Sequence, residues 1–343
     1  MKQLSQLGEF GLIEHLTKDI KIHNQSTIKG IGDDAAVLNH SNKNTVITTD
    51  LLVEGIHFNL TYVPLKHLGY KSVIVNLSDV YAMNAQPKQI VVSIAVSNRF
   101  KVEALDELYE GMKIACDKYG VDLVGGDTTS SLTGLVISIT AVGEVDSGKE
   151  VYRNTANETD LVCVSGNLGA AYAGLQVLER ERKLFEINPG FQPVLDIYDY
   201  IISRQLKPEA RRDIIKFFAD NNILPTSMID ISDGLSSEIL HICKQSGKGC
   251  NLYEEKIPID LETLKFAEEL NIDPTVFAMN GGEDYELLFT VSTKDYTKLL
   301  LNEDIRIIGH ITSKEDSVSL VTRGGNFVSV EAQGWNALLT DSK

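Results

Sequence analysis

The 343-residue chain has few cysteines, a deficit of basic residues and no long apolar run. Its four cysteines form no CxxC pair and have no zinc-ligand spacing with the seven histidines. This argues against a zinc site and indicates a reducing compartment, with Cys116 and Cys163 as core thiols. No apolar run nears the roughly 18 residues of a membrane helix, and the N-terminal MKQLSQLGEF is too polar for a signal peptide. We therefore expect a cytoplasmic protein without a membrane partner.

The charge balance is acidic, with 48 Asp and Glu against 32 Lys and Arg and a net charge of −16. A protein that binds nucleic acid would present a basic face, so we expect no nucleic-acid partner. An acidic surface suits divalent cations or a cationic substrate, although it also serves solubility alone. The hydrophobic content of 43% is ordinary for a globular protein with a sizeable core.

The order of strand and helix patterns predicts two α/β domains, the first with several antiparallel strands. The chain is long for one domain, and a polar stretch at 148–157 marks the boundary, so we expect domains at 1–149 and 150–343. We expect helices at 5–19, 65–84, 102–119, 170–180, 209–219 and 235–246, a loop at 181–193, and strands at 46–50, 89–96, 121–124, 135–145, 160–165, 227–231, 286–291, 305–310 and 318–321.

Short apolar strands in this sequence repeatedly run into turns that carry oxygen donors. The clearest is the strand at 46–50, which ends in Thr48, Thr49 and Asp50, with His57 seven residues further on. Oxygen donors at a strand end are suited to a hard cation such as Mg²⁺. Asp79 lies inside an apolar helix pattern, where an ionised carboxylate must be paired, metal-bound or protonated.

Acidic turns of this kind recur along the whole chain. A single Asp in such a turn is more often a helix cap or turn former than a ligand. If several converge, however, their repulsion must be neutralised, and bound Mg²⁺ is the simplest way. Because Mg²⁺ prefers one or two carboxylates plus substrate phosphates, the pattern suggests a nucleotide-phosphate site with several metal ions. The acids are Asp33, Asp34, Asp50, Asp79, Asp127, Asp230, Asp233, Glu283 and Asp284.

Two glycine-containing segments imitate other nucleotide motifs. Residues 143–150, GEVDSGKE, nearly spell a P-loop, but Glu150 stands where the Mg²⁺-binding hydroxyl belongs and a polar stretch follows instead of a helix. Gly166 and Gly169 resemble a dinucleotide-binding turn only weakly, because no acid follows at the expected distance. We interpret the second segment as a strand–helix turn, and whether a phosphate binds near it stays open.

Seven motifs, in the same order along nearly the whole chain, resemble the thiamine-monophosphate kinase family. This family belongs to a superfamily of ATP-using enzymes with aminoimidazole ribonucleotide synthetase and selenophosphate synthetase. The motifs are GEFGLI (8–13), GIGDDAAVL (30–38), TTDLLVEGIHF (48–58), NLSDVYAMNAQP (76–87), VGGDTT (124–129), DISDGL (230–235) and GGEDYELLF (281–289).

The resemblance implies an α/β (α+β) fold like that of aminoimidazole ribonucleotide synthetase. An N-terminal mixed-sheet domain would bind ATP and Mg²⁺ and form a homodimer, and a C-terminal α/β domain would complete the active site. The implied activity is that of a phosphotransferase with a phosphate group as acceptor: several Mg²⁺ ions assist transfer of the ATP γ-phosphoryl group to thiamine monophosphate.

Carried over residue by residue, the resemblance also implies three groups of site residues. No catalytic residue is implied beyond the metal ligands and Arg153, since the acceptor phosphate is already anionic. The substrate pocket rests on His57, Glu283 and Trp335, the last from a loose GWN match. The implied metal ligands are Asp34, Thr48, Thr49, Asp50, Asp79, Asp127, Asp230 and Asp233, and the implied ATP contacts are Tyr109, Gly126, Asp127, Arg153 and Ser232.

Two other functions stay open from the sequence. The first is another reaction of the same superfamily, the synthesis of an aminoimidazole or of selenophosphate. Selenophosphate synthesis requires a reactive cysteine in an N-terminal loop, and no cysteine precedes Cys116. The second is a non-catalytic nucleotide- or metal-binding dimer, which would have lost carboxylates, whereas none of the expected ones is missing.

Overall fold

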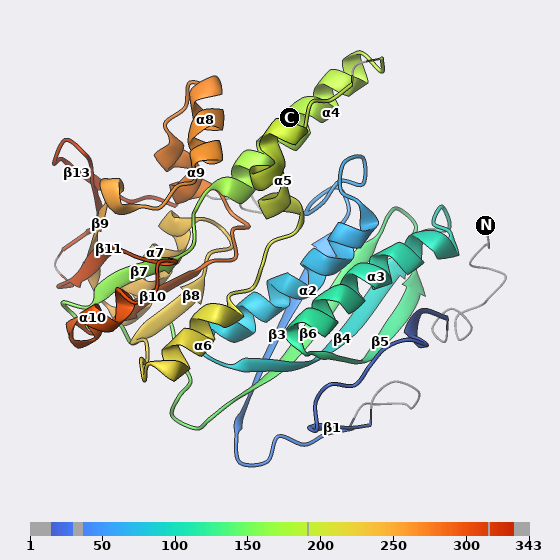
Figure 1. Cartoon of the computed structure of the whole chain (residues 1–343), viewed down its shortest axis with the longest axis horizontal. Coiled ribbons are helices and arrows are strands. Elements are labelled where there is room, and N and C mark those ends of the chain that lie inside the picture. The colour runs from blue at the N-terminus through green and yellow to red at the C-terminus, as the bar shows by residue number, and fades with distance from the viewer. Residues whose placement is uncertain (1–14, 30–36, 191, 315, 333–343) are drawn as a thin grey trace. The chain divides into compact units, whose positions relative to one another are not determined.

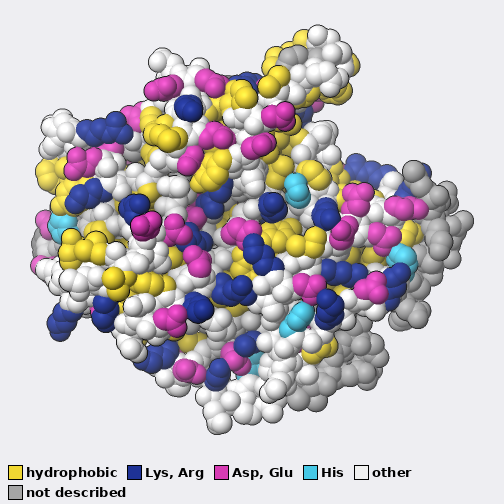
Figure 2. Space-filling view, viewed as in Figure 1, with side chains coloured by type: hydrophobic (Ala, Val, Ile, Leu, Met, Phe, Trp, Pro, Cys, Tyr) yellow, Lys and Arg dark blue, Asp and Glu magenta, His cyan; other side chains and the backbone are white. Residues whose placement is uncertain are grey.

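The computed structural model describes residues 15–29, 37–190, 192–314 and 316–332. The chain forms two compact units, Met1–Glu150 and Val151–Lys343, each with its own main sheet (Figure 1). The predicted mixed α/β fold class is confirmed. No helix in the described ranges is long and apolar enough to cross a membrane. On the face in Figure 2, described acidic and basic side chains are interspersed rather than gathered into patches of one sign.

The first unit is a four-stranded mixed sheet with two helices packed on one face (Figure 1). The strand order is β3-β6-β4-β5, and only β4 and β5 run parallel. A short antiparallel pair, β1 and β2, precedes the sheet. The elements are β1 (Thr27–Lys29), β2 (Val37–Leu38), β3 (Asn44–Val53), α2 (Leu65–Ala82), β4 (Gln86–Val96), α3 (Val102–Tyr119), β5 (Asp122–Ser130) and β6 (Val136–Val145).

Helix α2 is buried on nearly all sides, as its apolar pattern predicts. Two glycines allow α2 and α3 to pack closely. A Cβ at Gly69 would lie 1.9 Å from the Leu108 carbonyl oxygen, and one at Gly111 would lie 1.9 Å from that of Lys66. Only glycine permits such an approach of two backbones. Helix α2 therefore packs closely on α3 on one side and on β3, β4 and β6 on the other.

The second unit is a seven-stranded sheet in the order β13-β12-β9-β11-β7-β10-β8, antiparallel except between β9 and β12. Its strands are β7 (Leu161–Ser165), β8 (Ser227–Asp230), β9 (Gly249–Tyr253), β10 (Leu287–Val291), β11 (Ile305–Thr312), β12 (Val318–Val321) and β13 (Phe327–Ser329). Its helices are α4 (Ala170–Ile187), α5 (Asp199–Leu206), α6 (Arg212–Asp220), α7 (Leu235–Ser246), α8 (Leu261–Glu269), α9 (Pro274–Asn280) and α10 (Tyr296–Leu299), with short 3₁₀ turns at Asp196–Tyr198, Glu254–Lys256 and Thr293–Asp295.

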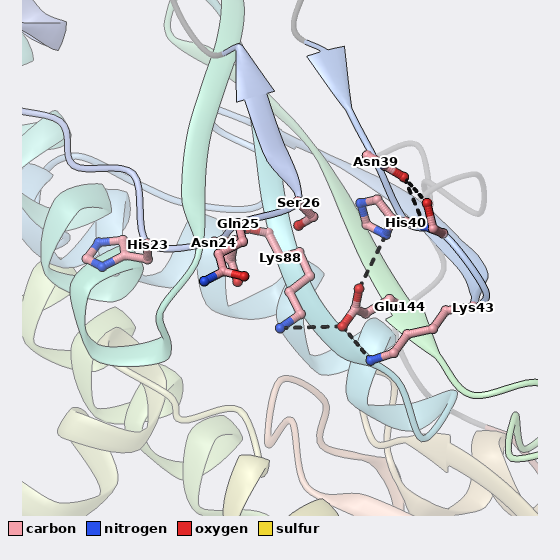
Figure 3. A pocket seen from close by; sticks show the side chains of 10 residues that line it. His23, Asn24, Gln25, Ser26, Asn39, His40, Lys43, Lys88 and Glu144 are labelled. Atoms are coloured by element: carbon pink, nitrogen blue, oxygen red, sulfur yellow. Dashed lines mark hydrogen bonds and ion pairs between the residues drawn. The ribbon is translucent and has the colours of Figure 1, made fainter.

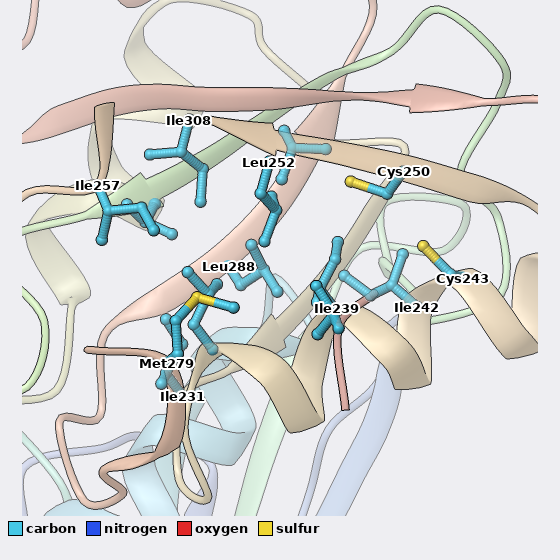
Figure 4. Close-up of a cluster of buried hydrophobic side chains, with 14 of the residues drawn as sticks. Ile231, Ile239, Ile242, Cys243, Cys250, Leu252, Ile257, Met279, Leu288 and Ile308 are labelled. Carbon is cyan, nitrogen blue, oxygen red and sulfur yellow. The ribbon is translucent and has the colours of Figure 1, made fainter. Parts of the chain in front are cut away.

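The core of the second unit lies between α7 and the sheet (Figure 4). Ile239 and Ile242 of α7 face Leu252 of β9 and Leu288 of β10, and all four side chains are fully buried. Burying each such side chain contributes about 1.5–3 kcal/mol. This packing fixes the start of α7, and with it the acidic loop between β8 and α7. The four free cysteines of the chain are buried, as predicted for Cys116 and Cys163.

Several predicted elements are wrong in extent, including the strands expected at 46–50 and 89–96, which are longer at one or both ends. Strand β5 continues past residue 124 to Ser130, because its second half pairs in parallel with β4, so the GGDTT motif lies in a strand rather than a turn. Helix α4 includes residues 181–187 of the expected loop, where Arg182 pairs with Glu179 and Glu186 along the helix. Helix α6 begins at Arg212 instead of 209. Of the helix expected at 5–19, residues 15–17 are helical, 18–19 form a turn, and the rest lies outside the described residues.

Candidate functional site

Three of the predicted metal ligands meet where β3 faces α2. The Thr48 Oγ1 donates a hydrogen bond to Asp79 Oδ2 at 2.6 Å. The backbone N–H of Asp50 donates to Asn76 Oδ1 at 3.1 Å, which ties the strand to the helix beside this pair. Burial raises the pKa of Asp50 to about 6, and the charge of Asp79 adds to the rise. Two carboxyl groups are therefore close enough to repel each other, with a hydroxyl beside them.

Asp127 lies on the opposite face of this sheet. In the strand register Asp127 pairs with Ser93, Ser93 with Ser138, and Ser138 with Leu51. Paired residues project on the same side of a sheet, so Asp127 shares a face with Leu51, whereas the next residue along, Asp50, projects toward α2. Since β3 and β5 are the two edge strands, they lie about 14 Å apart. The sheet alone does not bring Asp127 to the cluster of Asp50.

Thr49 also lies on this outer face. Its Oγ1 donates to the Ile139 carbonyl oxygen at 3.1 Å and accepts from Thr140 Oγ1 at 3.0 Å. The predicted ATP contact Gly126 has a packing reason of its own, since a Cβ there would lie 2.0 Å from the Val92 carbonyl oxygen. The close pairing of β5 with β4 therefore explains a glycine at this position of the motif, whether or not ATP contacts it.

Three more predicted residues have distinct surroundings. The His57 Nδ1 accepts the N–H of Val53 at 3.1 Å, so in the neutral ring Nε2 carries the proton. Tyr109 is buried in α3, and burial raises its pKa to about 12. Arg153 is exposed, and its carbonyl oxygen accepts from Ser227 Oγ at 3.0 Å. Asp33, Asp34 and Trp335 lie outside the described residues.

In the second unit, the predicted Asp230, Ser232 and Asp233 occupy the loop between β8 and α7. Asp230 ends the strand and is 3% exposed. The loop is held by Glu238 in the first turns of α7, whose Oε1 accepts the N–H of Asp233 at 2.9 Å. Burial raises the pKa of Glu238 to about 8, and the charges of Asp233 and Asp230 add to the rise. Glu238 is not among the residues predicted from the sequence, although an acid near a helix start is a recognisable signal.

The two acidic motifs of this unit lie side by side. The Glu283 N–H donates to the Ser232 carbonyl oxygen at 2.8 Å, and the Tyr285 N–H donates to that of Ile231 at 2.9 Å. Partial burial raises the pKa of Asp233; nearby His241 lowers it and Glu283 raises it further. The second unit therefore gathers Asp230, Asp233 and Glu283 in one region, which their sequence separation alone does not reveal.

The next acid, Asp284, is a helix cap. It is fully buried, and its carboxylate accepts the N–H groups of Gly169 at 2.6 Å and Ala171 at 3.2 Å at the start of α4. Burial raises its pKa to about 6 although Arg204 and the two amides oppose this. The glycine turn at 166–169 thus receives a carboxylate of the protein at the position where a phosphate was left open.

Within the described residues, no three His, Cys, Asp or Glu side chains gather closely enough to hold a metal ion. A metal site there would need other donors, such as hydroxyl groups, substrate phosphates or residues outside the described ranges. A cavity of about 570 Å³ lies elsewhere in the first unit (Figure 3). Around it Lys43 and Lys88 lie 2.7 Å and 3.6 Å from the carboxylate of Glu144. No described site residue lines this cavity, and we assign its ion pairs to the packing of the strand ends.

Comparison with known proteins gives a consistent result over the full length. The family model "AIR synthase related protein, N-terminal domain" matches residues 32–145. A thiamine-monophosphate kinase of Bacillus subtilis (strain 168) is 33% identical over 336 residues, 96% of this chain and 99% of that protein. One from Aquifex aeolicus (strain VF5) is 34% identical over 97% of this chain and 99% of its own.

Solved structures with a similar fold include a protein of the same kind as these relatives. A structure described as AaThiL complexed with AMPPCP and TMP is 32% identical, with a TM-score of 0.74 over 98% of each chain. The hydrogenase maturation protein HypE in complex with ATP, at 19% identity and a TM-score of 0.73 over 93% of this chain and 94% of its own, shares the fold.

Proposed function

Since this chain belongs to the thiamine-monophosphate kinase family, we propose that it transfers the γ-phosphoryl group of ATP to thiamine monophosphate, forming thiamine diphosphate and ADP. The family predicted from the seven motifs is confirmed. The structural observation that carries the proposal is the meeting of Asp50, Asp79 and Thr48 between β3 and α2. Paired carboxylates beside a hydroxyl suit a reaction that depends on neutralising phosphate charge.

The donors in this cluster fit Mg²⁺. All are hard oxygen ligands, and two carboxylates leave the remaining positions to water and substrate phosphate, which Mg²⁺ prefers. Burial and the charge of Asp79 raise the pKa of Asp50, and a bound cation would favour its ionised form. When bound, Mg²⁺ would neutralise charge on the phosphate oxygens. We assign the same role to Asp34, Thr49, Asp127, Asp230 and Asp233 by family resemblance.

The remaining site residues act by binding and orientation. Thr48 holds one oxygen of Asp79, and Glu238 holds the backbone of the loop that carries Ser232 and Asp233. The exposed guanidinium of Arg153 can clamp an ATP phosphate bidentately. The acceptor phosphate is an anionic nucleophile at neutral pH, so no general base is required. For ATP we further propose Tyr109, Gly126, Asp127 and Ser232, and for the thiamine moiety His57, Glu283 and Trp335.

We propose a homodimer built on the outer face of the first unit's sheet. Two apolar residues of β3 project from this face, Ile47, which is 67% exposed, and Leu51, which is 53% exposed. Neighbouring exposed apolar side chains on a sheet face favour association with a partner. Thr49 and Asp127 share this face, so such a dimer would bring them close to the other copy. A cytoplasmic location stays a prediction.

Acceptor choice tests the proposed function. ADP release is measured with thiamine monophosphate, free thiamine or an aminoimidazole precursor as the acceptor, with EDTA as the metal-free control. Free thiamine lacks the anionic nucleophile and leaves phosphate-binding groups unpaired, which can give discrimination of roughly 10⁴–10⁵. We expect a kcat/KM ratio of that order in favour of thiamine monophosphate. A ratio near one, or turnover of the aminoimidazole precursor instead, would refute the proposal.

A further inference from the structure

The C-terminal turn of α5 holds the acidic loop at 283–286. Gln205 Nε2 donates a hydrogen bond to Glu283 Oε2 at 2.7 Å. The neighbouring Arg204 donates to the Asp284 carbonyl oxygen at 3.0 Å and pairs with Glu286 Oε1 at 2.9 Å. Two adjacent residues of one helix therefore contact both the backbone and the side chains of this loop.

The backbone of this loop is strained and firmly held. Glu283 has a φ of +66° and Tyr285 a φ of +52°, a region that non-glycine residues rarely adopt. Hydrogen bonds to Ser232 and Ile231 hold both residues there. A Cβ at Gly282 would lie 2.3 Å from the Ser232 carbonyl oxygen, so the two loops touch through their backbones. Strain that persists under such restraint is typical of functional sites.

A fixed backbone does not by itself fix the long side chain of Glu283. The hydrogen bond from Gln205 selects one direction for its carboxylate. Gln205 is itself fixed, because it is 6% exposed on α5, and α5 packs closely on α4. A Cβ at Gly174 of α4 would lie 2.1 Å from the Ile201 carbonyl oxygen. A neutral amide orients a carboxylate and leaves its negative charge in place, whereas an arginine at the same position would cancel that charge.

We propose that Gln205 is a positioning residue, which aims the Glu283 carboxylate at the thiamine moiety of the acceptor. The inference rests on the proposed function, which places Glu283 against that moiety. Gln205 touches neither ATP nor the reacting phosphate in this scheme. Its loss therefore weakens acceptor binding rather than the transfer step, and raises KM for thiamine monophosphate with little effect on kcat.

Two substitutions and a matched control test this role. Gln205→Met keeps the length of the side chain and removes the N–H donor, and Gln205→Glu keeps the shape and replaces the donor with a carboxylate. Gln176→Met makes the same change on α4, at a half-buried glutamine outside this network. For each variant we measure kcat, KM for both substrates, thiamine-monophosphate binding by calorimetry, and the melting temperature.

We expect KM and Kd for thiamine monophosphate to rise about tenfold or more in both Gln205 variants, since a hydrogen bond to a charged group is lost. KM for ATP should stay within about twofold, and the control should match the wild type. If Gln205→Met does not fold, the isosteric Gln205→Glu decides. Unchanged acceptor binding in the Gln205 variants, or an equal rise in both KM values, overturns the role of Gln205. The kinase proposal still stands in that case if the wild type phosphorylates thiamine monophosphate. A wild type that neither binds nor phosphorylates thiamine monophosphate overturns both.

Discussion

The buried carboxyl group of Glu238 predicts that Glu238→Gln stabilises the protein at alkaline pH. Glu238 is 2% exposed, and burial raises its pKa from an ordinary value of 4.5 to about 8 in the folded chain. Between these two values the folded state retains a proton that the unfolded state has released. The stability contribution is therefore fully present below about pH 4.5 and is lost as the pH rises through about 8.

The magnitude follows from the size of this shift. Because one pKa unit corresponds to about 1.4 kcal/mol, the wild type should lose about 2 kcal/mol of unfolding free energy between pH 6 and pH 8. Glutamine is neutral at both pH values and can still accept the N–H of Asp233. The variant should avoid this loss and melt several degrees higher than the wild type at pH 8, at about 2–4 °C per kcal/mol for a unit of this size.

The assay is thermal and urea unfolding at pH 6 and pH 8 in EDTA, since a bound cation near Asp230 and Asp233 would lower the pKa of Glu238. Glu255→Gln, an exposed acid of the same unit, serves as the matched control and should leave the pH dependence unchanged. Glu238→Ala removes the acceptor and should be destabilising at both pH values by about 1–3 kcal/mol. Equal pH slopes in the wild type and Glu238→Gln would show that Glu238 is ionised at neutral pH.

Three further substitutions test the proposed site and assembly. Asp50→Asn removes the charge of a proposed metal ligand with little change of shape. Loss of a residue that only supports a metal ligand lowers activity roughly 10–100-fold, so this variant should lose more; activity within about tenfold of wild type at saturating Mg²⁺ would contradict this. Arg153→Lys loses the planar fork, so KM for ATP should rise with the fold intact; an unchanged KM would mean that Arg153 only faces solvent. Ile47→Glu places a charge on the apolar sheet face, and sedimentation analysis should show a monomer; a persisting dimer would exclude this face as the interface.

Much of the fold follows from local pattern, and the errors have local causes. Helix α2 has apolar residues distributed around its whole circumference, and its burial follows from that pattern. Strand β5 is longer than expected because its GGDTT segment has the composition of a turn but is held by pairing with β4. The last two turns of α4 are rich in Glu and Arg, and ion pairs along the helix keep them helical. Composition alone does not show such partners.

The candidate site was less predictable, because its supporting residues lie on ordinary helices. Gln205 and Arg204 belong to a short amphipathic helix whose sequence gives no sign of a distant partner. Glu238 has only a general signal, an acid near a helix start. The contact of Thr48 with Asp79 depends on how α2 crosses β3, and spacing along the chain does not specify that crossing. The motifs identified the acidic residues, whereas the side chains that contact them could be found only from the tertiary structure.

Similar acidic motifs in this chain receive different partners, and this difference separates structural acids from candidate ligands. The carboxylate of Asp284 accepts two helix N–H groups and lies 4.0 Å from Arg204, and Glu286 pairs with Arg204 and Arg211. Both carboxylates therefore have hydrogen-bond donors and a cationic partner within the protein itself. In the described part of the chain, no cation or N–H donor reaches the carboxylate of Asp50, which is partly buried beside Asp79. A buried carboxylate without a partner of opposite charge is stabilised either by a proton or by a cation, and for this reason we place the proposed Mg²⁺ here rather than at Asp284 or Glu286.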